Sequence, residues 1–450
     1  MLSQLAMVGA MTTTVPSLQN LSTAKKLNCF ISVDPSLFPE NPAAVPGPEE
    51  FGKEQPLTHV PFVAKDIVDT GGLFPTTAGT PTLHNSRPKS VAPVIAALQK
   101  AGAVLYGTTN LHELSFGITS NNAHTGPVRN PVAPERSAGG SSGGTAVAVA
   151  LGLAQFGIAA DTGGSARLPA AFCGIYGFRP THGRYDSAGV VPISPTRDTL
   201  GLMADSISTI ATVDAVITGE AAWDTDEFAD LQGLRIGVAS DVFGQAFDPV
   251  VAEAFTQARH ALARAGIELV EVDVSAAQEI TTEISMPLCL AEFPQALQEY
   301  LDAAGTGLTV SEVAEQVASR DVRAVLDVAL AYEHNTEQDH AQLAARRSEG
   351  QKAYAQALVE ADVEFLIYPT SPAQAPEIAA DGTTEHLGQR VDAFTLHTAH
   401  AHLAGCLGFP AASIQVASTG LPVGIDVAGG FNQDRRVLAL ADRMSALLLS

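Results

Sequence analysis

The stretch "RSAGGSSGGTAVAV" at residues 136–149 places two serines, the first of them Ser141, between two pairs of glycines. Further along the chain, "DTGGSAR" at 161–167 sets Ser165 directly behind another glycine pair. Glycine- and serine-rich runs are usually linkers. The apolar sequence "AVAVALGLA" that follows the first motif is instead typical of a buried segment. The two motifs therefore belong inside a folded core.

Two common uses of glycine-rich loops do not fit these motifs. A phosphate-binding loop needs a lysine directly after its glycines, and a nucleophile elbow needs the pattern G-x-S-x-G. Neither motif meets either requirement. Glycine allows a positive φ and lets successive backbone N–H groups converge on one point, which suits a developing oxyanion. Hydroxyls on such turns favour acyl-transfer chemistry.

A lone lysine lies upstream in a segment that reads as a strand. Lys65 stands in "LTHVPFVAKDIVD", among apolar and β-branched neighbours. Burial disfavours the charged form of an amine and lowers its pKa. A neutral amine can accept a proton from a serine hydroxyl and so activate a weak alcohol nucleophile. The residues thus permit Ser–Lys acyl transfer, although their spacing does not prove it.

Composition limits the class of protein. The chain has 450 residues, 46% apolar and 16% charged, which predicts a sizeable buried core. Its net charge of −23 opposes nucleic acid and anionic membranes as partners. We find no apolar run long enough to span a bilayer. Four scattered cysteines without a C-x-x-C pair predict buried, reduced thiols and a cytoplasmic location.

The order of the expected elements predicts the fold class. Strands and helices alternate from residue 28 onward, which is typical of an α/β layered fold. Helix-forming sequence at about 245–360 interrupts this alternation. We therefore expect a single domain over 1–450 with a helix-rich insertion. The first eleven residues predict an amphipathic helix rather than a signal peptide, and 41–56 predict a Pro- and Gly-rich loop.

Together these segments resemble the amidase signature family of serine hydrolases. "GGSSGG", "DTGGSAR", "HVPFVAKD", "AGAVLYGTTN", "GPVRNP", "FCGIYGFRPTHGR" and "GLPVGIDV" occur in the family's order and cover most of 28–440. The resemblance implies a central mixed, twisted sheet covered by helices on both faces. It also implies a catalytic triad in which Ser165 is the nucleophile, Ser141 a bridging serine after a cis peptide bond, and Lys65 the base. No metal or cofactor is implied.

The resemblance also assigns the surrounding residues. The implied oxyanion donors are the N–H groups of Thr162, Gly163, Gly164 and Ser165. Three side chains are expected to support the loops: Asp161, Arg167 and Ser142. The expected substrate-binding residues are Leu111, Phe116, Gly117, Ile118, Thr119, Gly139, Gly140 and Ile193. We also expect the helical stretch 280–350 to narrow the entrance, so that substitutions in "ISMPLCLAEF" at 284–293 alter KM more than the chemical step. The histidines of "HTAHAHLAG" at 397–405 are expected to be packing or surface groups.

Within the family, "TTAGTPTL", "HELSFGITSNN" and "AGVVPISPTRDTLG" resemble the branch of indoleacetamide and mandelamide hydrolases. That branch cleaves simple amides with an aryl-containing acyl part. Aryl carbamates, anilides and activated esters remain alternatives, because acyl-enzyme chemistry discriminates weakly among leaving groups. Two departures from the family pattern, Thr108 for a usual lysine and Asp426 for a usual glutamine, leave the exact substrate open.

The expected partner is a small-molecule amide or carbamate, bound by a monomer or homodimer. A subunit that amidates misacylated tRNA would share the triad, but the net charge of −23 disfavours a tRNA partner. A catalytically inactive scaffold is disfavoured because Lys65, Ser141 and Ser165 are all present.

Overall fold

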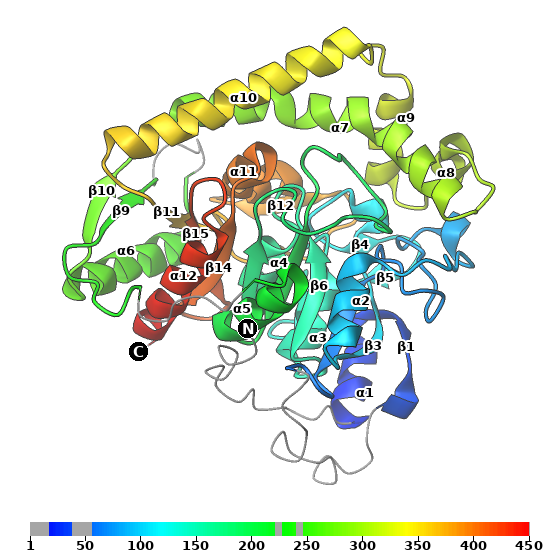
Figure 1. Ribbon diagram of the computed structural model, residues 1–450, viewed down its shortest axis with the longest axis horizontal. Helices are drawn as coiled ribbons and strands as arrows, with labels where there is room; N and C mark the ends of the chain where they lie inside the picture. The colour runs from blue at the N-terminus through cyan, green and yellow to red at the C-terminus, as the bar shows by residue number, and fades with distance from the viewer. Residues whose placement is uncertain (1–17, 38–55, 221–226, 240–245, 450) are drawn as a thin grey trace.

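An eleven-stranded mixed sheet forms the centre of the computed structural model, which describes residues 18–37, 56–220, 227–239 and 246–449 (Figure 1). The expectations for the first eleven residues and for nearly all of 41–56 lie outside these residues. From one edge to the other, the strands are β1 (Phe30–Val33), β3 (Val104–Thr109), β2 (Pro61–Lys65), β6 (Phe156–Ala160), β8 (Leu200–Ala204), β7 (Tyr176–Arg179), β14 (Ala411–Val416), β15 (Val423–Ala428), β11 (Leu366–Pro369), β9 (Arg235–Val238) and β10 (Glu268–Glu271).

The sheet is mixed because its two ends contain parallel pairs and its middle does not. β2 runs parallel to β3 and β6, and β9 runs parallel to β10 and β11. The strands between them, from β6 through β8, β7, β14 and β15 to β11, pair antiparallel. This confirms the predicted α/β class with a mixed central sheet.

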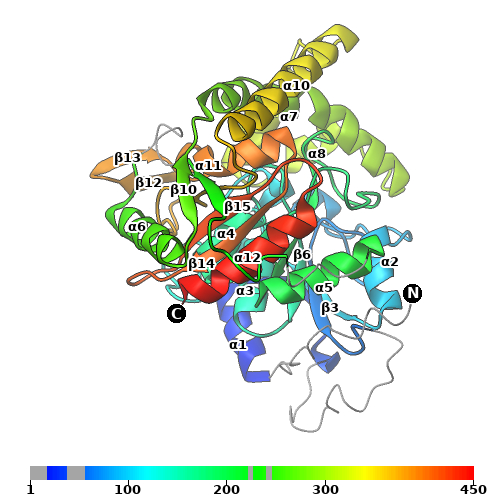
Figure 2. The same ribbon diagram turned by 60° about the vertical axis from the view of Figure 1, so that its left-hand side comes forward.

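Helices cover both faces of the sheet. Successive side chains of β2 point to opposite faces, and because all of them are buried, each face must be covered. Phe62 and Ala64 pack into the hydrophobic cluster that includes residues of α2, α5 and α12, whereas Val63 packs with residues of α1, α3 and α4 on the other face. Figure 2 shows α5 and α12 in front of the sheet. The bounds of these helices are α1 (Leu18–Leu27), α2 (Pro93–Lys100), α3 (Gly143–Ala150), α4 (Arg167–Cys173), α5 (Ile207–Thr218) and α12 (Asp434–Leu448).

The remaining helices lie mostly in the second half of the chain. They are α6 (Pro249–Arg264), α7 (Ser275–Ala303), α8 (Val310–Gln316), α9 (Arg320–Leu330), α10 (Glu337–Glu360) and α11 (Ala393–Leu407). The long helices α7 and α10 lie side by side beyond one edge of the core in Figure 1. Treating this region as an insertion into one domain stays a prediction. Among the described residues, no helix combines the length and apolarity that crossing a bilayer needs.

The polypeptide backbone approaches itself closely where α3 begins. The Gly144 N–H donates to the carbonyl oxygen of Asn110 over 2.9 Å. A Cβ at Gly144 would lie 2.3 Å from the carbonyl oxygen of Cys29 and 2.5 Å from that of Asn110. Any larger residue would push α3 away from β3, so this glycine fixes the position of the first serine motif.

Candidate active site

Lys65 is the last residue of β2, between the ends of β3 and β6. Its side chain is fully buried, and its Nζ donates a hydrogen bond to Oγ of Ser141 over 2.7 Å. Burial lowers the pKa of Lys65 to about 7, although the negative charges of Asp198 and Asp161 oppose the shift. A substantial fraction of this amine is therefore neutral near pH 7.

Ser141 lies just before the start of α3 and is held there by its backbone. The Gly140–Ser141 peptide bond is cis, and the Ser141 carbonyl accepts the His112 N–H over 3.1 Å and the Ser120 hydroxyl over 3.2 Å. The neighbouring Ser142 makes two longer contacts, both 3.4 Å, with the backbone of Ala160 at the end of β6. Ser142 therefore lies where a residue supporting the loop would lie.

The second glycine motif forms the turn between β6 and α4. Asp161 accepts the N–H groups of Gly164 over 2.9 Å and of Ala166 over 3.2 Å. Gly164 has a φ of +110°, which side-chain-bearing residues rarely adopt, and this conformation brings Ser165 to the cavity. The N–H of Gly164, expected to face the oxyanion, donates to the Asp161 carboxylate in this structure, and its oxyanion role stays a prediction.

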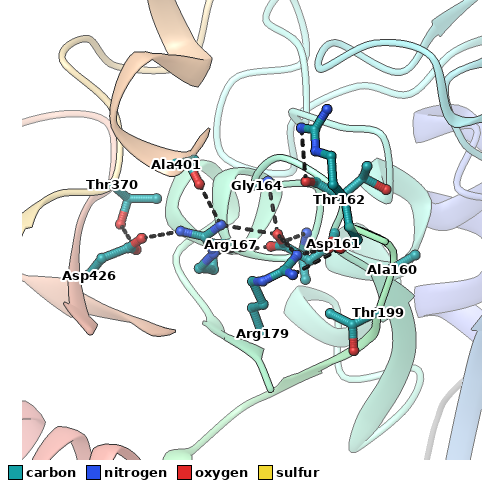
Figure 3. Close-up of polar contacts among 12 residues, drawn as sticks. Ala160, Asp161, Thr162, Gly164, Arg167, Arg179, Thr199, Thr370, Ala401 and Asp426 are labelled. Atoms are coloured by element: carbon teal, nitrogen blue, oxygen red, sulfur yellow. Dashed lines mark hydrogen bonds and ion pairs between the residues drawn. The ribbon is translucent and has the colours of Figure 1, made fainter. Parts of the chain in front are cut away.

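A buried network of charges lies beneath this turn (Figure 3). Arg167 donates to Asp161 over 3.0 and 3.1 Å, to Asp426 over 2.6 Å, and to the carbonyl of Ala401 over 2.9 Å. Arg179 also pairs with the Asp161 carboxylate, over 3.2 Å. All four charged side chains are fully buried, and their two positive and two negative charges cancel.

The arginines also set the ionisation of the carboxylate that shapes the turn. Burial alone would raise the pKa of Asp161, but the charges of Arg167 and Arg179 outweigh it and hold that pKa below its ordinary value. Asp161 is thus an ionised acceptor for the N–H groups of the turn. Asp161 and Arg167 are buried beneath the turn and do not line the cavity, and the loop-supporting role expected of them stays a prediction.

A cavity of about 310 Å³ opens in front of the second glycine motif. Ser165, 7% exposed, lines it together with Thr162 and Gly163, whereas Ser141 is fully buried. Five expected substrate-binding residues also line it: Phe116, Gly117, Ile118, Thr119 and Ile193.

Three other expected substrate-binding residues do not line this cavity. Leu111 is fully buried in the main hydrophobic cluster and packs against Gly79. A Cβ at Gly139 would meet Pro169 and Phe172, and one at Gly140 would meet the backbone at Ile118 and Ser120. The structure thus shows these three residues in packing positions, and their expected contact with substrate stays a prediction.

Several cavity residues were not predicted from the sequence as site residues. They include His112, Arg197, Ser285, Met286, Cys289, Asp321, Val325, Phe394 and His402. Met286 and Cys289 belong to α7, within the 280–350 stretch expected to narrow the entrance. His402, expected to be a packing or surface group, packs so closely on Gly163 that a Cβ there would lie 2.6 Å from its ring. His397 and His400 are buried and bonded to Ser371 and Pro369, as packing groups would be.

Comparison with known proteins identifies the class to which this fold and site belong. The chain matches the Amidase family over residues 13–438, and it therefore belongs to the amidase family. It is 38% identical to the indoleacetamide hydrolase of Agrobacterium vitis over 388 residues, which is 85% of this chain and 82% of that protein. It is 34% identical to the mandelamide hydrolase of Pseudomonas putida over 455 residues, or 96% and 87% of the two chains.

Solved structures agree with this assignment. A crystal structure of an amidase aligns with a TM-score of 0.81 at 30% identity, covering 96% of this chain and 94% of the other. The peptide amidase of Stenotrophomonas maltophilia aligns with a TM-score of 0.78 at 26% identity, covering 96% and 92%. Within the family, the protein is an amide hydrolase that cleaves carbon–nitrogen bonds.

Proposed function

We propose that this amidase hydrolyses small amides with an aryl-containing acyl group through a Lys65–Ser141–Ser165 relay and an acyl-enzyme. One observation carries the proposal: a fully buried lysine with its pKa lowered to about 7 contacts a buried serine over 2.7 Å, behind a cavity lined by a second serine. A neutral amine in that place can receive a proton that an exposed lysine would not accept at pH 7.

In the proposed reaction, the neutral Lys65 Nζ accepts the hydroxyl proton of Ser141. Ser141 in turn accepts the proton of Ser165, while Ser165 Oγ attacks the amide carbonyl. The proton then returns through Ser141 to the leaving nitrogen as the C–N bond breaks. Water releases the acyl group from Ser165 by the same relay. The N–H groups of Thr162, Gly163 and Ser165 are the proposed donors to the oxyanion, each worth about 3–4 kcal/mol of the barrier.

The cavity wall supports an aryl substrate. Phe116 packs edge-on against Phe293 of α7, with ring centroids 4.7 Å apart, so this aromatic wall is held in place. Ile118, Ile193 and Met286 add apolar surface around it. The relatives named for hydrolysis of indoleacetamide and mandelamide are consistent with such a pocket.

The decisive experiment offers the purified protein indole-3-acetamide, mandelamide, an aryl carbamate, an anilide and an aryl ester. We expect the two aryl amides to give the highest kcat/KM. A covalent serine inhibitor should appear by mass spectrometry on the peptide that contains Ser165. Preference for the carbamate would move the assignment to a urethanase. Label on any other residue would contradict the relay.

The pH dependence of kcat/KM should follow the ionisation of the Lys65 amine. Because the neutral amine is the active form, kcat/KM should rise with pH through about 7 and then level off, falling roughly tenfold per pH unit well below the midpoint. Asp66, whose pKa burial raises to about 7, bonds to the Thr77 N–H over 3.1 Å and is the competing candidate. Asp66→Asn should leave the midpoint of the kcat/KM pH profile unchanged. Loss of the midpoint in this variant would assign the profile to Asp66.

Substitution of Met286 should act on binding. Met286 is 42% exposed and lines the cavity from α7. Met286→Ala removes apolar wall but none of the groups proposed to react, so KM should rise roughly 5-fold while kcat stays within about twofold. Val359→Ala, on the exposed surface of α10, is the matched control. Equal losses in kcat and kcat/KM for Met286→Ala would count against this role.

A further inference from the structure

A hydrogen-bonded pair of polar side chains stands in the otherwise mainly apolar cavity wall. His112 Nε2 and Asp321 Oδ2 lie 2.9 Å apart, and both residues line the cavity. His112 follows β3 and is 2% exposed, whereas Asp321 is in the first turn of α9 and its side chain is 56% exposed. The His112 N–H also bonds to the Ser141 carbonyl, so the pair links the segment that contacts Ser141 to helix α9.

The position of this pair is fixed by a second set of bonds. The buried Glu113 carboxylate accepts the N–H groups of Ala318 over 3.1 Å and of Ser319 over 2.7 Å, at the start of α9. Ser319 Oγ accepts the N–H of Ala123 over 3.1 Å. Since these bonds connect the segment after β3 to the start of α9 at several points, Asp321 is held before a ligand arrives.

The imidazole has little capacity left for a ligand. Its Nε2 bonds to Asp321, and its Nδ1 lies 3.4 Å from Thr119 Oγ1. The ring packs so closely on Gly117 that a Cβ there would lie 2.2 Å from it. The Asp321 carboxylate accepts from His112 and from backbone N–H groups at the start of α9, but it has several lone pairs and its side chain is 56% exposed, so Asp321 is the member that can accept a further hydrogen bond.

The other carboxylates that line the cavity, those of Asp381 and Asp392, form hydrogen bonds or ion pairs with residues close to them in the sequence. Asp381 accepts the Thr383 hydroxyl over 2.8 Å and pairs with Arg390 over 2.9 Å. Asp392 accepts the N–H and the hydroxyl of Thr395 over 2.7 and 2.6 Å, as the cap of α11. Both belong to the hairpin of β12 (Thr383–His386) and β13 (Gln389–Asp392) or its approach.

We propose that Asp321, oriented by His112, is a specificity-determining acceptor for an O–H or N–H donor on the acyl part of the substrate. The inference rests on the proposed function, because it places the acyl group in this cavity. A hydrogen bond to a charged acceptor is stronger than a neutral one. A substrate lacking the donor forgoes this bond, while Asp321 keeps only its bonds within the protein. Asp321 thus selects polar-substituted aryl acyl groups within an apolar pocket.

The test compares two pairs of amides that differ in one donor: mandelamide with phenylacetamide, and indole-3-acetamide with its 1-methyl derivative. Titration calorimetry with the non-hydrolysing Ser165→Ala variant measures binding, and the enzyme with Ser165 intact supplies kcat/KM. With Asp321 intact, the donor compound of at least one pair should bind about 10-fold more tightly. Asp321→Ala should abolish that preference, and Asp321→Asn, which can still accept from His112, should reduce it partly.

Asp327→Asn removes a carboxylate from the exposed side of the same helix and should leave the preference unchanged. Equal binding within both pairs, or a preference that persists in Asp321→Ala, would overturn the inference. The two proposals fail separately. If the protein hydrolyses amides but shows no preference for the donor compounds, only the role of Asp321 is rejected. If it binds the donor compounds more tightly but hydrolyses no amide, only the proposed reaction is rejected.

Discussion

Replacement of Lys65 by methionine is expected to lower kcat/KM by roughly 10⁴-fold or more, with a much smaller change in KM. If Lys65 is the base, as proposed, its removal leaves Ser141 and Ser165 as ordinary alcohols, because members of such a relay act as a unit. Methionine fills nearly the same buried volume without an amine, so the space around β2 is kept. Steady-state kinetics on mandelamide and indole-3-acetamide measure the effect.

Two controls separate chemistry from folding in this experiment. Lys100→Met makes the same replacement at the exposed end of α2 and should leave kcat/KM unchanged. The unfolding midpoint in urea should be at least as high for Lys65→Met as for the unsubstituted protein, because a buried amine is removed. Hydrolysis that survives in a folded Lys65→Met protein would show that another group activates the serine.

Replacement of Arg167 by glutamine should cause the largest loss of stability. The change leaves Asp161 and Asp426 buried, with only Arg179 to balance two negative charges. Breaking one side of a buried ion pair typically costs about 3–5 kcal/mol. The free energy of unfolding, measured by urea denaturation, should fall by that amount, and activity should fall with it because Asp161 shapes the turn before Ser165.

Arg346→Gln is the matched control for this prediction. Arg346 pairs with Glu283 over 2.7 Å at the surface, where water and salt screen the charges. Its loss should leave the urea midpoint close to that of the unsubstituted protein. Comparable losses in the two variants would mean that the buried network contributes no more to stability than a surface ion pair does.

The sequence predicted the parts of the site that local pattern determines. Lys65 stood out as the one lysine in a mainly apolar strand segment, and the glycine pairs marked the turns that carry Ser141 and Ser165. The alternation in β2 places neighbouring side chains on opposite faces, which the two hydrophobic clusters confirm. The catalytic roles assigned to these residues stay predictions, to be tested as described above.

The rest of the cavity depends on contacts between distant segments, which pattern does not reveal. Asp321 and Met286 come from helices more than a hundred residues beyond the glycine motifs, and only tertiary packing brings them there. The sequence did carry one signal for the buried network: Asp426 stands where the family usually has glutamine, and its partner proves to be Arg167. A charge in an apolar strand is expected to be buried, and a buried charge predicts an oppositely charged side chain packed against it.

The contacts of Arg167 also bear on the order in which the enzyme can assemble. This residue binds the carbonyl of Ala401 and the carboxylate of Asp426, so the turn before Ser165 is supported by residues more than two hundred positions further along the chain. A ribosome must therefore release residue 426 before that support is complete. Until then, a nascent chain holds Ser165 without the bonds that shape its turn.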